Sequence, residues 1–198
     1  MRSFLCMLFI LFFSNSIYSQ ALRRDTIKVI KKTNTYVSPA CQASTNVLAY
    51  KDELYDHPDD YFIGNSYNSN QCIRQLLNAI GFYATMIKDS DAYLMLLDRI
   101  CSTADDSVSK YLLDVGRVQF YKNFDHMFIY CYTHKHSCFE KRMIQGLIME
   151  ITSSKDPVIQ KKKIDQFILN KIKELQLGDR GTNYLNEIRK TLYNCVPG

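Results

Sequence analysis

The chain has 198 residues, of which 46% are hydrophobic and 23% are charged, and its formal net charge is +5. This composition is that of an ordinary globular protein and excludes intrinsic disorder for most of the chain. The charge is mildly basic and well below that of a typical nucleic-acid-binding domain, so we expect no nucleic-acid partner. With 7 Gly and 4 Pro, the chain also lacks the frequent turns of an all-β sandwich.

Residues 1–19 have the layout of a secretory signal peptide. Arg2 precedes an unbroken apolar run at residues 4–13, and small or polar residues then lead to Ser19. The run is shorter than the about 20 apolar residues that cross a bilayer, so we expect no stable membrane span. Cleavage after Ser19 would make Gln20 the first residue of the mature chain. The segment resembles bacterial export signals, which implies a periplasmic or secreted protein.

Residues 20–40 are rich in β-branched and basic residues, a pattern that favours an extended tail or one edge strand. The apolar spacing changes to that of helices after Pro39, and a first helix is predicted over residues 41–55. Apolar residues at three- and four-residue steps, together with capping residues, predict further helices at residues 70–87, 91–101, 105–121, 124–132, 139–151, 157–178 and 182–192.

These helices predict a single compact all-α domain of seven or eight helices over residues 41–198. In the 105–121 helix, Val115 and Val118 fall on the face expected to be buried. Asp156 followed by Pro157 is a strong helix start, because proline suits the first helical turn. Short turns join the predicted helices, and we find no internal repeat and no linker that would divide the domain.

Six cysteines follow the predicted signal peptide, and an even number in an exported chain implies disulfide bonds. Cys131 and Cys138 flank a predicted turn almost symmetrically, which favours a bond between them. Helical rise places Cys72 and Cys101 at similar heights on two antiparallel helices, which favours a second bond. The third bond would then join the remaining pair, Cys41 and Cys195.

The segment from Cys131 to Cys138 also holds His134 and His136, so it contains the residue types of a tetrahedral zinc site. Structural zinc sites usually place a long loop between two ligand pairs, whereas here all four residues lie within eight positions. Lys135 between the histidines would also repel a cation. We therefore favour the disulfide over the zinc site and expect a protein that works without a metal or a cofactor.

We find no catalytic signature, such as a nucleophile elbow, a phosphate-binding loop or a zinc-protease motif. The sequence therefore favours an exported, disulfide-stapled helical protein that binds another protein. Small exported helical proteins with a cysteine bridge resemble immunity proteins, so an immunity or inhibitor protein against an envelope-targeted toxin is one alternative. The other is a helical hydrolase of envelope polymer, with Asp105, Asp106 or Glu140 as catalytic acids.

Two features would separate these alternatives. A polar cleft that holds two facing carboxylates would favour the enzyme, because such a pair divides the roles of acid and base. An exposed patch rich in tyrosine would favour the binding protein, since tyrosine is common in protein interfaces and the chain has 14 of them.

Overall fold

The computed structural model describes residues 37–62, 67–86 and 90–195. The predicted signal peptide at residues 1–19 and nearly all of the predicted extended segment at residues 20–40 lie outside these ranges. The first described helix begins at Pro39, where the Ser38 side chain accepts a hydrogen bond from the Cys41 backbone N–H. Pro39 and Ala40 therefore belong to the helical region and not to the extended segment.

The prediction of an all-α fold is confirmed, and no strand is present in the described ranges. The described residues form ten helices: α2 (Pro39–Thr45), α3 (Val47–Asp56), α4 (Asp59–Phe62), α5 (Tyr67–Met86), α6 (Ser90–Thr103), α7 (Asp106–Lys122), α8 (Phe124–Thr133), α9 (Cys138–Thr152), α10 (Pro157–Glu174) and α11 (Asp179–Asn194).

The number of helices exceeds the predicted seven or eight because of the region before α5. The predicted helix over residues 41–55 is divided at Asn46, whose backbone leaves the helical region with φ −153° and ψ 69°. The Asn46 side chain accepts a hydrogen bond from the Ala49 backbone N–H at 3.4 Å and so caps α3. A further short helix, α4, forms between the predicted helices at residues 41–55 and 70–87.

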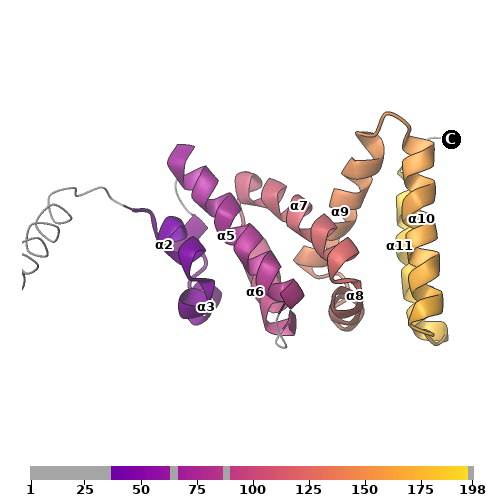
Figure 1. The fold of residues 1–198 in the computed structure, drawn as a ribbon, viewed down its shortest axis with the longest axis horizontal. Coiled ribbons are helices and arrows are strands. Elements are labelled where there is room, and N and C mark those ends of the chain that lie inside the picture. The colour runs from indigo at the N-terminus through magenta and orange to yellow at the C-terminus, as the bar shows by residue number, and fades with distance from the viewer. Residues whose placement is uncertain (1–36, 63–66, 87–89, 196–198) are drawn as a thin grey trace, which may run out of the picture. The chain divides into compact units, whose positions relative to one another are not determined.

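The helices pack in two rows (Figure 1). In the first row α2 contacts α5, α5 contacts α7, and α7 contacts α9, while in the second row α3 contacts α6 and α6 contacts α8. Helices α10 and α11 pack against each other and against α9. Helix α6 of the second row also contacts α9 of the first, so the two rows pack against each other.

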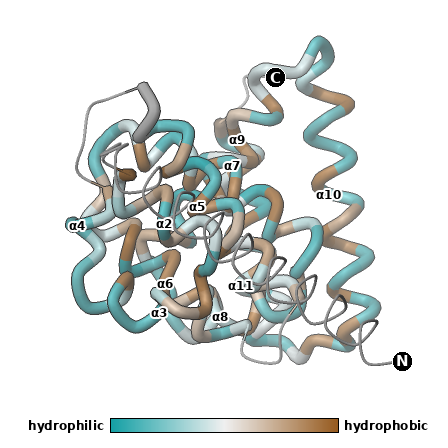
Figure 2. The backbone as a smooth tube through the Cα atoms, turned by 60° about the vertical axis from the view of Figure 1, so that its left-hand side comes forward, coloured by the Kyte–Doolittle hydropathy of each residue, from teal (hydrophilic) through white to brown (hydrophobic). Residues whose placement is uncertain are grey.

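Each helix buries one face and leaves the other to solvent. Hydrophobic and hydrophilic stretches accordingly alternate along the tube in Figure 2. The side chains that the two rows enclose include Leu76 and Ile80 of α5, Leu97 of α6 and Leu112 of α7, all of which are fully buried. Burying side chains of this size stabilises a fold by roughly 1.5–3 kcal/mol each.

Two disulfide bonds staple the helices. Cys41 of α2 is bonded to Cys72 of α5 with a Cα–Cα distance of 4.7 Å, and Cys101 of α6 is bonded to Cys138 at the start of α9 with a Cα–Cα distance of 5.7 Å. Both distances lie in the usual range for a disulfide. The prediction of a disulfide-stapled domain is confirmed, but each bond joins two different helix pairs.

The predicted partners of the cysteines are therefore wrong for all three bonds, which were Cys131–Cys138, Cys72–Cys101 and Cys41–Cys195. The Cys131 side chain is buried beside Tyr184 and does not face Cys138. Cys195 is a free, exposed thiol at the end of α11, which packs against α9 and α10 and not against α2. The two bonds predicted within helix hairpins do not form because Cys72 and Cys138 are each bonded to a cysteine of another helix pair.

Two glycines let α7 and α9 approach each other backbone to backbone. A Cβ atom added to Gly116 of α7 would lie 2.8 Å from the Met143 Cα and 3.0 Å from the Met143 backbone N of α9. A Cβ atom added to Gly146 of α9 would collide with the Leu113 carbonyl oxygen of α7. Larger residues would push the two helices apart, so these glycines set the distance between them.

Candidate functional site

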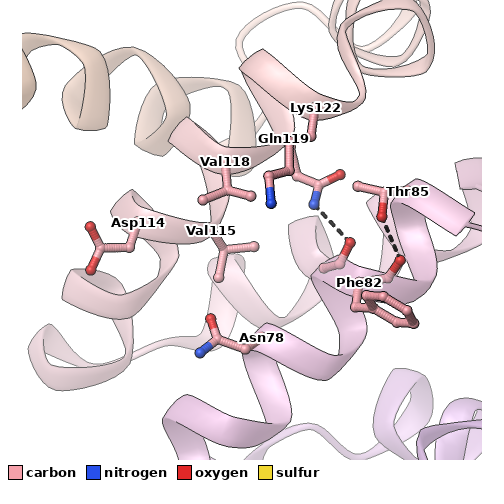
Figure 3. Close-up of a pocket in the computed structure, with 9 residues that line it drawn as sticks. Asn78, Phe82, Thr85, Asp114, Val115, Val118, Gln119 and Lys122 are labelled. Atoms are coloured by element: carbon pink, nitrogen blue, oxygen red, sulfur yellow. Dashed lines mark hydrogen bonds between the residues drawn. The ribbon is translucent and has the colours of Figure 1, made fainter.

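A pocket of about 240 Å³ lies between α5 and α7 (Figure 3). Side chains from one face of each helix line it, and the helices run side by side along its length. The lining residues are Asn78, Gly81, Phe82, Thr85, Asp114, Val115, Val118, Gln119 and Lys122.

Hydrogen bonds between side chains of α7 and carbonyl groups of α5 hold the floor of this pocket. The Gln119 Nε2 donates to the Gly81 carbonyl oxygen at 2.8 Å, and the Asn123 Nδ2 donates to the Ala84 carbonyl oxygen at 2.8 Å. The Asn123 amide also donates to the Gln119 Oε1 at 3.2 Å. These groups are buried, and their partners satisfy them, so the floor is a fixed part of the fold.

Gly81 contributes to this arrangement because it has no side chain. A Cβ atom at Gly81 would lie 3.0 Å from the Val115 Cγ1 and 3.3 Å from the Gln119 Nε2. The close approach of α5 to Val115 and Gln119 therefore requires glycine or a small shift of those side chains.

Large apolar side chains at the rim of the pocket are exposed to solvent. Phe82 is 56% exposed and Val118 is 37% exposed, and Met86, one turn beyond Phe82 on α5, is 68% exposed. We predicted from the helical pattern that Val118 faces the core, and this is wrong because α5 leaves the pocket open in front of it. Neighbouring exposed apolar side chains around a hollow are typical of a contact surface.

A second pocket, of about 520 Å³, lies on the other side of the exposed stripe of α7, next to α9. Asp114 lines both pockets, so they adjoin. The residues that line the second pocket are Arg74, Lys110, Tyr111, Leu113, Asp114, Arg117, Gly146, Met149, Glu150 and Ser153. We refer to the residues lining the two pockets together as the α5–α7–α9 face.

Both carboxylates of this face lie beside one guanidinium group. The Arg117 Nη2 lies 3.9 Å from the Asp114 Oδ1, and the Arg117 Nη1 lies 3.7 Å from the Glu150 Oε2. The Tyr121 hydroxyl donates to the Glu150 Oε1 at 3.2 Å. Burial and the neighbouring Glu150 carboxylate raise the pKa of Tyr121 well above its usual value, so its hydroxyl stays protonated as a donor.

Glu140, which the sequence offered as a catalytic acid, is buried at the start of α9 and fully engaged in hydrogen bonds. The Tyr184 hydroxyl donates to the Glu140 Oε1 at 2.6 Å, and the backbone N–H of His136 donates to the Glu140 Oε2. Burial, followed by the nearby Cys131 and Glu140, raises the pKa of Tyr184 strongly. This arrangement joins α9 to α11 and does not open to solvent.

The other two candidate acids lie at the start of α7 and are exposed. The Asp105 Oδ1 accepts hydrogen bonds from the backbone N–H groups of Ser107 and Val108, each at 2.9 Å, and so caps α7. These bonds hold the pKa of Asp105 below its usual value. Asp106 occupies the first turn of the same helix, where a negative charge suits the helix dipole.

The residues of the considered zinc site do not converge. Cys138 is bonded to Cys101, Cys131 is buried, and His134 and His136 are exposed. In the part of the chain that the structure describes, no three or more His, Cys, Asp or Glu side chains come together in a way that could hold a metal ion. The expectation that the protein works without a metal or cofactor stays a prediction.

Tyrosines in the described ranges serve mainly in packing and do not form the exposed patch that would have favoured a binding protein. Tyr93, Tyr130 and Tyr184 are buried, whereas Tyr55 and Tyr193 are exposed on α3 and α11, which belong to different helix pairs. The exposed apolar side chains of the α5–α7–α9 face are instead phenylalanine, valine and methionine. Among the described helices, none combines the length and the apolarity needed to cross a membrane.

The α5–α7–α9 face is not recognisable in the sequence, because its residues come from three helices. On α7 the exposed stripe recurs at every fourth residue from Lys110 to Lys122, which is ordinary for a solvated helix face. The one local signal was Phe82, a large apolar residue outside the predicted apolar face of its helix.

Comparison with known proteins identifies no relative: no protein-family model, curated protein or solved structure matches the chain.

Proposed function

We propose that the protein is exported, remains disulfide-stapled in an oxidising compartment, and acts by binding another protein at the α5–α7–α9 face. The observation that carries this proposal is the exposure of Phe82 and Val118 at the rim of a pocket whose floor is fixed by buried hydrogen bonds. A rigid hollow with an aromatic rim suits the anchor side chain of a partner, because binding then orders few groups.

The exposed apolar rim supports a protein partner for the pocket between α5 and α7. The volume of this pocket, about 240 Å³, is below the roughly 300–1,000 Å³ of most small-molecule sites, whereas the adjoining pocket of about 520 Å³ lies within that range. A side chain inserted from a partner would need only part of that space, and the exposed surface around the pocket would be covered by the rest of the partner.

The proposed export has two lines of support. Residues 1–19 have the composition of a signal peptide, and the two disulfide bonds are of a kind that persists in the periplasm or outside the cell. Intact mass of material from the periplasm or medium is expected to show a chain that begins at Gln20 or within a residue or two of it. A chain that begins at Met1 and stays in the cytosol would contradict export.

No observation favours the hydrolase. Asp114 and Glu150 are the two carboxylates of the face, and both lie beside the guanidinium group of Arg117, which compensates their charge. An immunity or inhibitor protein is compatible with the proposal, since it too would act by binding.

The test of the binding site compares two exposed apolar residues. Phe82 on α5 and Ile129 on α8 are 56% and 52% exposed, so their replacement by serine changes the surface to a similar extent. The oxidised mature protein would be immobilised and used to retain proteins from its native envelope extract. We expect Phe82→Ser to lower retention of a specific partner at least about tenfold, as for an interface anchor, and Ile129→Ser to retain it.

The same set of retained proteins with Phe82→Ser as with the unsubstituted protein would contradict this site. Loss of the partner with Ile129→Ser alone would place the interface on the row of α3, α6 and α8 instead.

A further inference from the structure

The α5–α7–α9 face carries an excess of positive charge around its apolar rim. Four cationic side chains line the two pockets, against the two carboxylates of Asp114 and Glu150. Both carboxylates are near Arg117 and are compensated by it. The other three cations are Arg74, Lys110 and Lys122.

These three cations are available to a ligand. Arg74, Lys110 and Lys122 are exposed, and within the described ranges none of them forms an ion pair, whereas Lys171 lies 2.8 Å from Glu174 and Arg189 is paired with Asp165. Exposed lysines occur elsewhere too, for example at Lys162 and Lys163 of α10, but those line neither of the two pockets.

The spacing of the cations places the apolar rim between them. Lys110, Val118 and Lys122 lie on one stripe of α7, with eight residues from Lys110 to Val118 and four from Val118 to Lys122. At about 1.5 Å per residue, the two lysines are about 18 Å apart along the helix, and Val118 lies between them. An apolar side chain seated at Val118 and Phe82 would thus have a cation on either side.

We propose that the segment of the partner that docks here is acidic and carries one large apolar side chain with carboxylates on both sides of it. This inference rests on the proposed function and specifies the partner of the same face. The apolar side chain occupies the pocket between Phe82 and Val118, and the carboxylates face Lys122 at one end and Lys110 and Arg74 at the other. Charge complementarity of this kind steers association and selects partners.

An anionic bilayer is the other surface that basic and apolar residues attract, and the geometry disfavours it. Phe82 and Val118 border a hollow that can take up a single inserted side chain, whereas a bilayer offers a broad layer of headgroups. A protein segment fits this feature, because one of its side chains enters the hollow.

The experiment is a selection from a phage library of random dodecapeptides on the immobilised, oxidised mature protein. We expect the enriched peptides to combine several Asp or Glu residues with at least one large apolar residue. Binding of a synthetic enriched peptide is expected to weaken at least about tenfold when salt rises from about 50 mM to about 500 mM. It is expected to weaken to a similar degree in the double variant Arg74→Glu/Lys110→Glu, while the matched double variant Lys162→Glu/Lys163→Glu binds as the unsubstituted protein does.

Each contrary result has a separate meaning. Enriched peptides that are neutral or basic but still depend on Phe82 would overturn the acidic partner and leave the proposed binding site in place. Peptides that bind equally well to Phe82→Ser, or no enrichment at all, would overturn the binding site itself. Sedimentation with vesicles of phosphatidylglycerol and phosphatidylethanolamine that depends on Phe82 and Lys110 would show that a membrane, and not an acidic protein, is the partner.

Discussion

The close contact of α7 with α9 makes Gly116→Ala the most direct test of the packing. The added Cβ atom would lie 2.8 Å from the Met143 Cα, 3.0 Å from its backbone N and 3.2 Å from its Cβ. None of these atoms can turn away, because they belong to the backbone of α9 or are bonded directly to it. Restoring a separation of 3.4 Å, the start of ordinary van der Waals contact, requires α7 and α9 to move apart by roughly 0.6 Å. Atom pairs across an interface lose about a quarter to a half of their dispersion energy when a gap of about 0.5–1 Å opens between them.

The expected magnitude is the balance of two effects. Overpacking of a well-packed interior costs about 1–3 kcal/mol, whereas alanine in a helix is more favourable than glycine by about 0.5–1 kcal/mol. We therefore expect Gly116→Ala to lower the free energy of unfolding by about 1–2 kcal/mol. With an m value of about 2 kcal/mol per M in urea, the midpoint of unfolding falls by about 0.5–1 M.

Urea unfolding of the oxidised protein, followed by circular dichroism, measures this shift. Gly178→Ala is the control, since a Cβ atom at Gly178 would meet nothing within 4 Å, and it should change the unfolding free energy by less than about 1 kcal/mol through the weaker helix cap alone. A Gly116→Ala protein that is as stable as the unsubstituted one, or more stable, would refute the backbone contact between α7 and α9.

Three further predictions concern bonds within the fold. Peptide mapping after alkylation is expected to recover the two disulfides and two alkylated thiols, and a linked Cys131–Cys138 peptide would contradict the structure. Reduction is expected to lower the free energy of unfolding by about 2–5 kcal/mol for each bond broken. Asp105→Ala should cost about 1 kcal/mol, and Asp105→Asn should keep the cap. Hydrogen bonds lower the pKa of Asp105 in the folded state, so its charge stabilises the fold above its unfolded pKa of about 3.9. This contribution is lost as the pH falls through the lower pKa of the folded state. A difference in unfolding free energy between the unsubstituted protein and Asp105→Asn that does not change in acid would contradict this. Tyr184→Phe leaves the buried Glu140 carboxylate with one hydrogen-bond donor fewer and should lower the free energy of unfolding in urea by about 1–3 kcal/mol. Tyr193→Phe, at an exposed tyrosine, is the control. A loss of stability in Tyr184→Phe as small as that in Tyr193→Phe would show that the Tyr184 hydroxyl is dispensable.

Helix positions could be predicted from the sequence because the signals that set them are local. Asp105 and Asp156 cap α7 and α10 as the sequence indicated, and Pro157 occupies the first turn of α10. The division at Asn46 was missed because its side chain serves as a cap only when the backbone has already left the helical conformation. A single asparagine in a helical pattern does not reveal which of the two occurs.

The disulfide bonds and the contact face could not be predicted because they depend on which helices become neighbours. Cys101 and Cys138 meet because α6 packs against α9, two helices that are separated in sequence by α7 and α8. The exposure of Val118 likewise depends on the hollow that α5 leaves in front of it. Helical periodicity identifies an apolar face, but it does not show where that face is left uncovered.

The position of the Cys101–Cys138 bond relates the staple to the proposed site. The bond closes a loop with a sequence separation of 37 residues, and this loop contains all of α7 and α8. Closing a loop of this length lowers the entropy of the unfolded chain by an amount worth about 4 kcal/mol. The bond joins α6 to α9, which precede and follow α7 and α8 in the chain and contact each other directly, so it limits how far α7 and α8 can move from the rest of the domain. Since α7 carries the exposed stripe of the α5–α7–α9 face, the disulfide holds in place the helix on which the proposed binding depends.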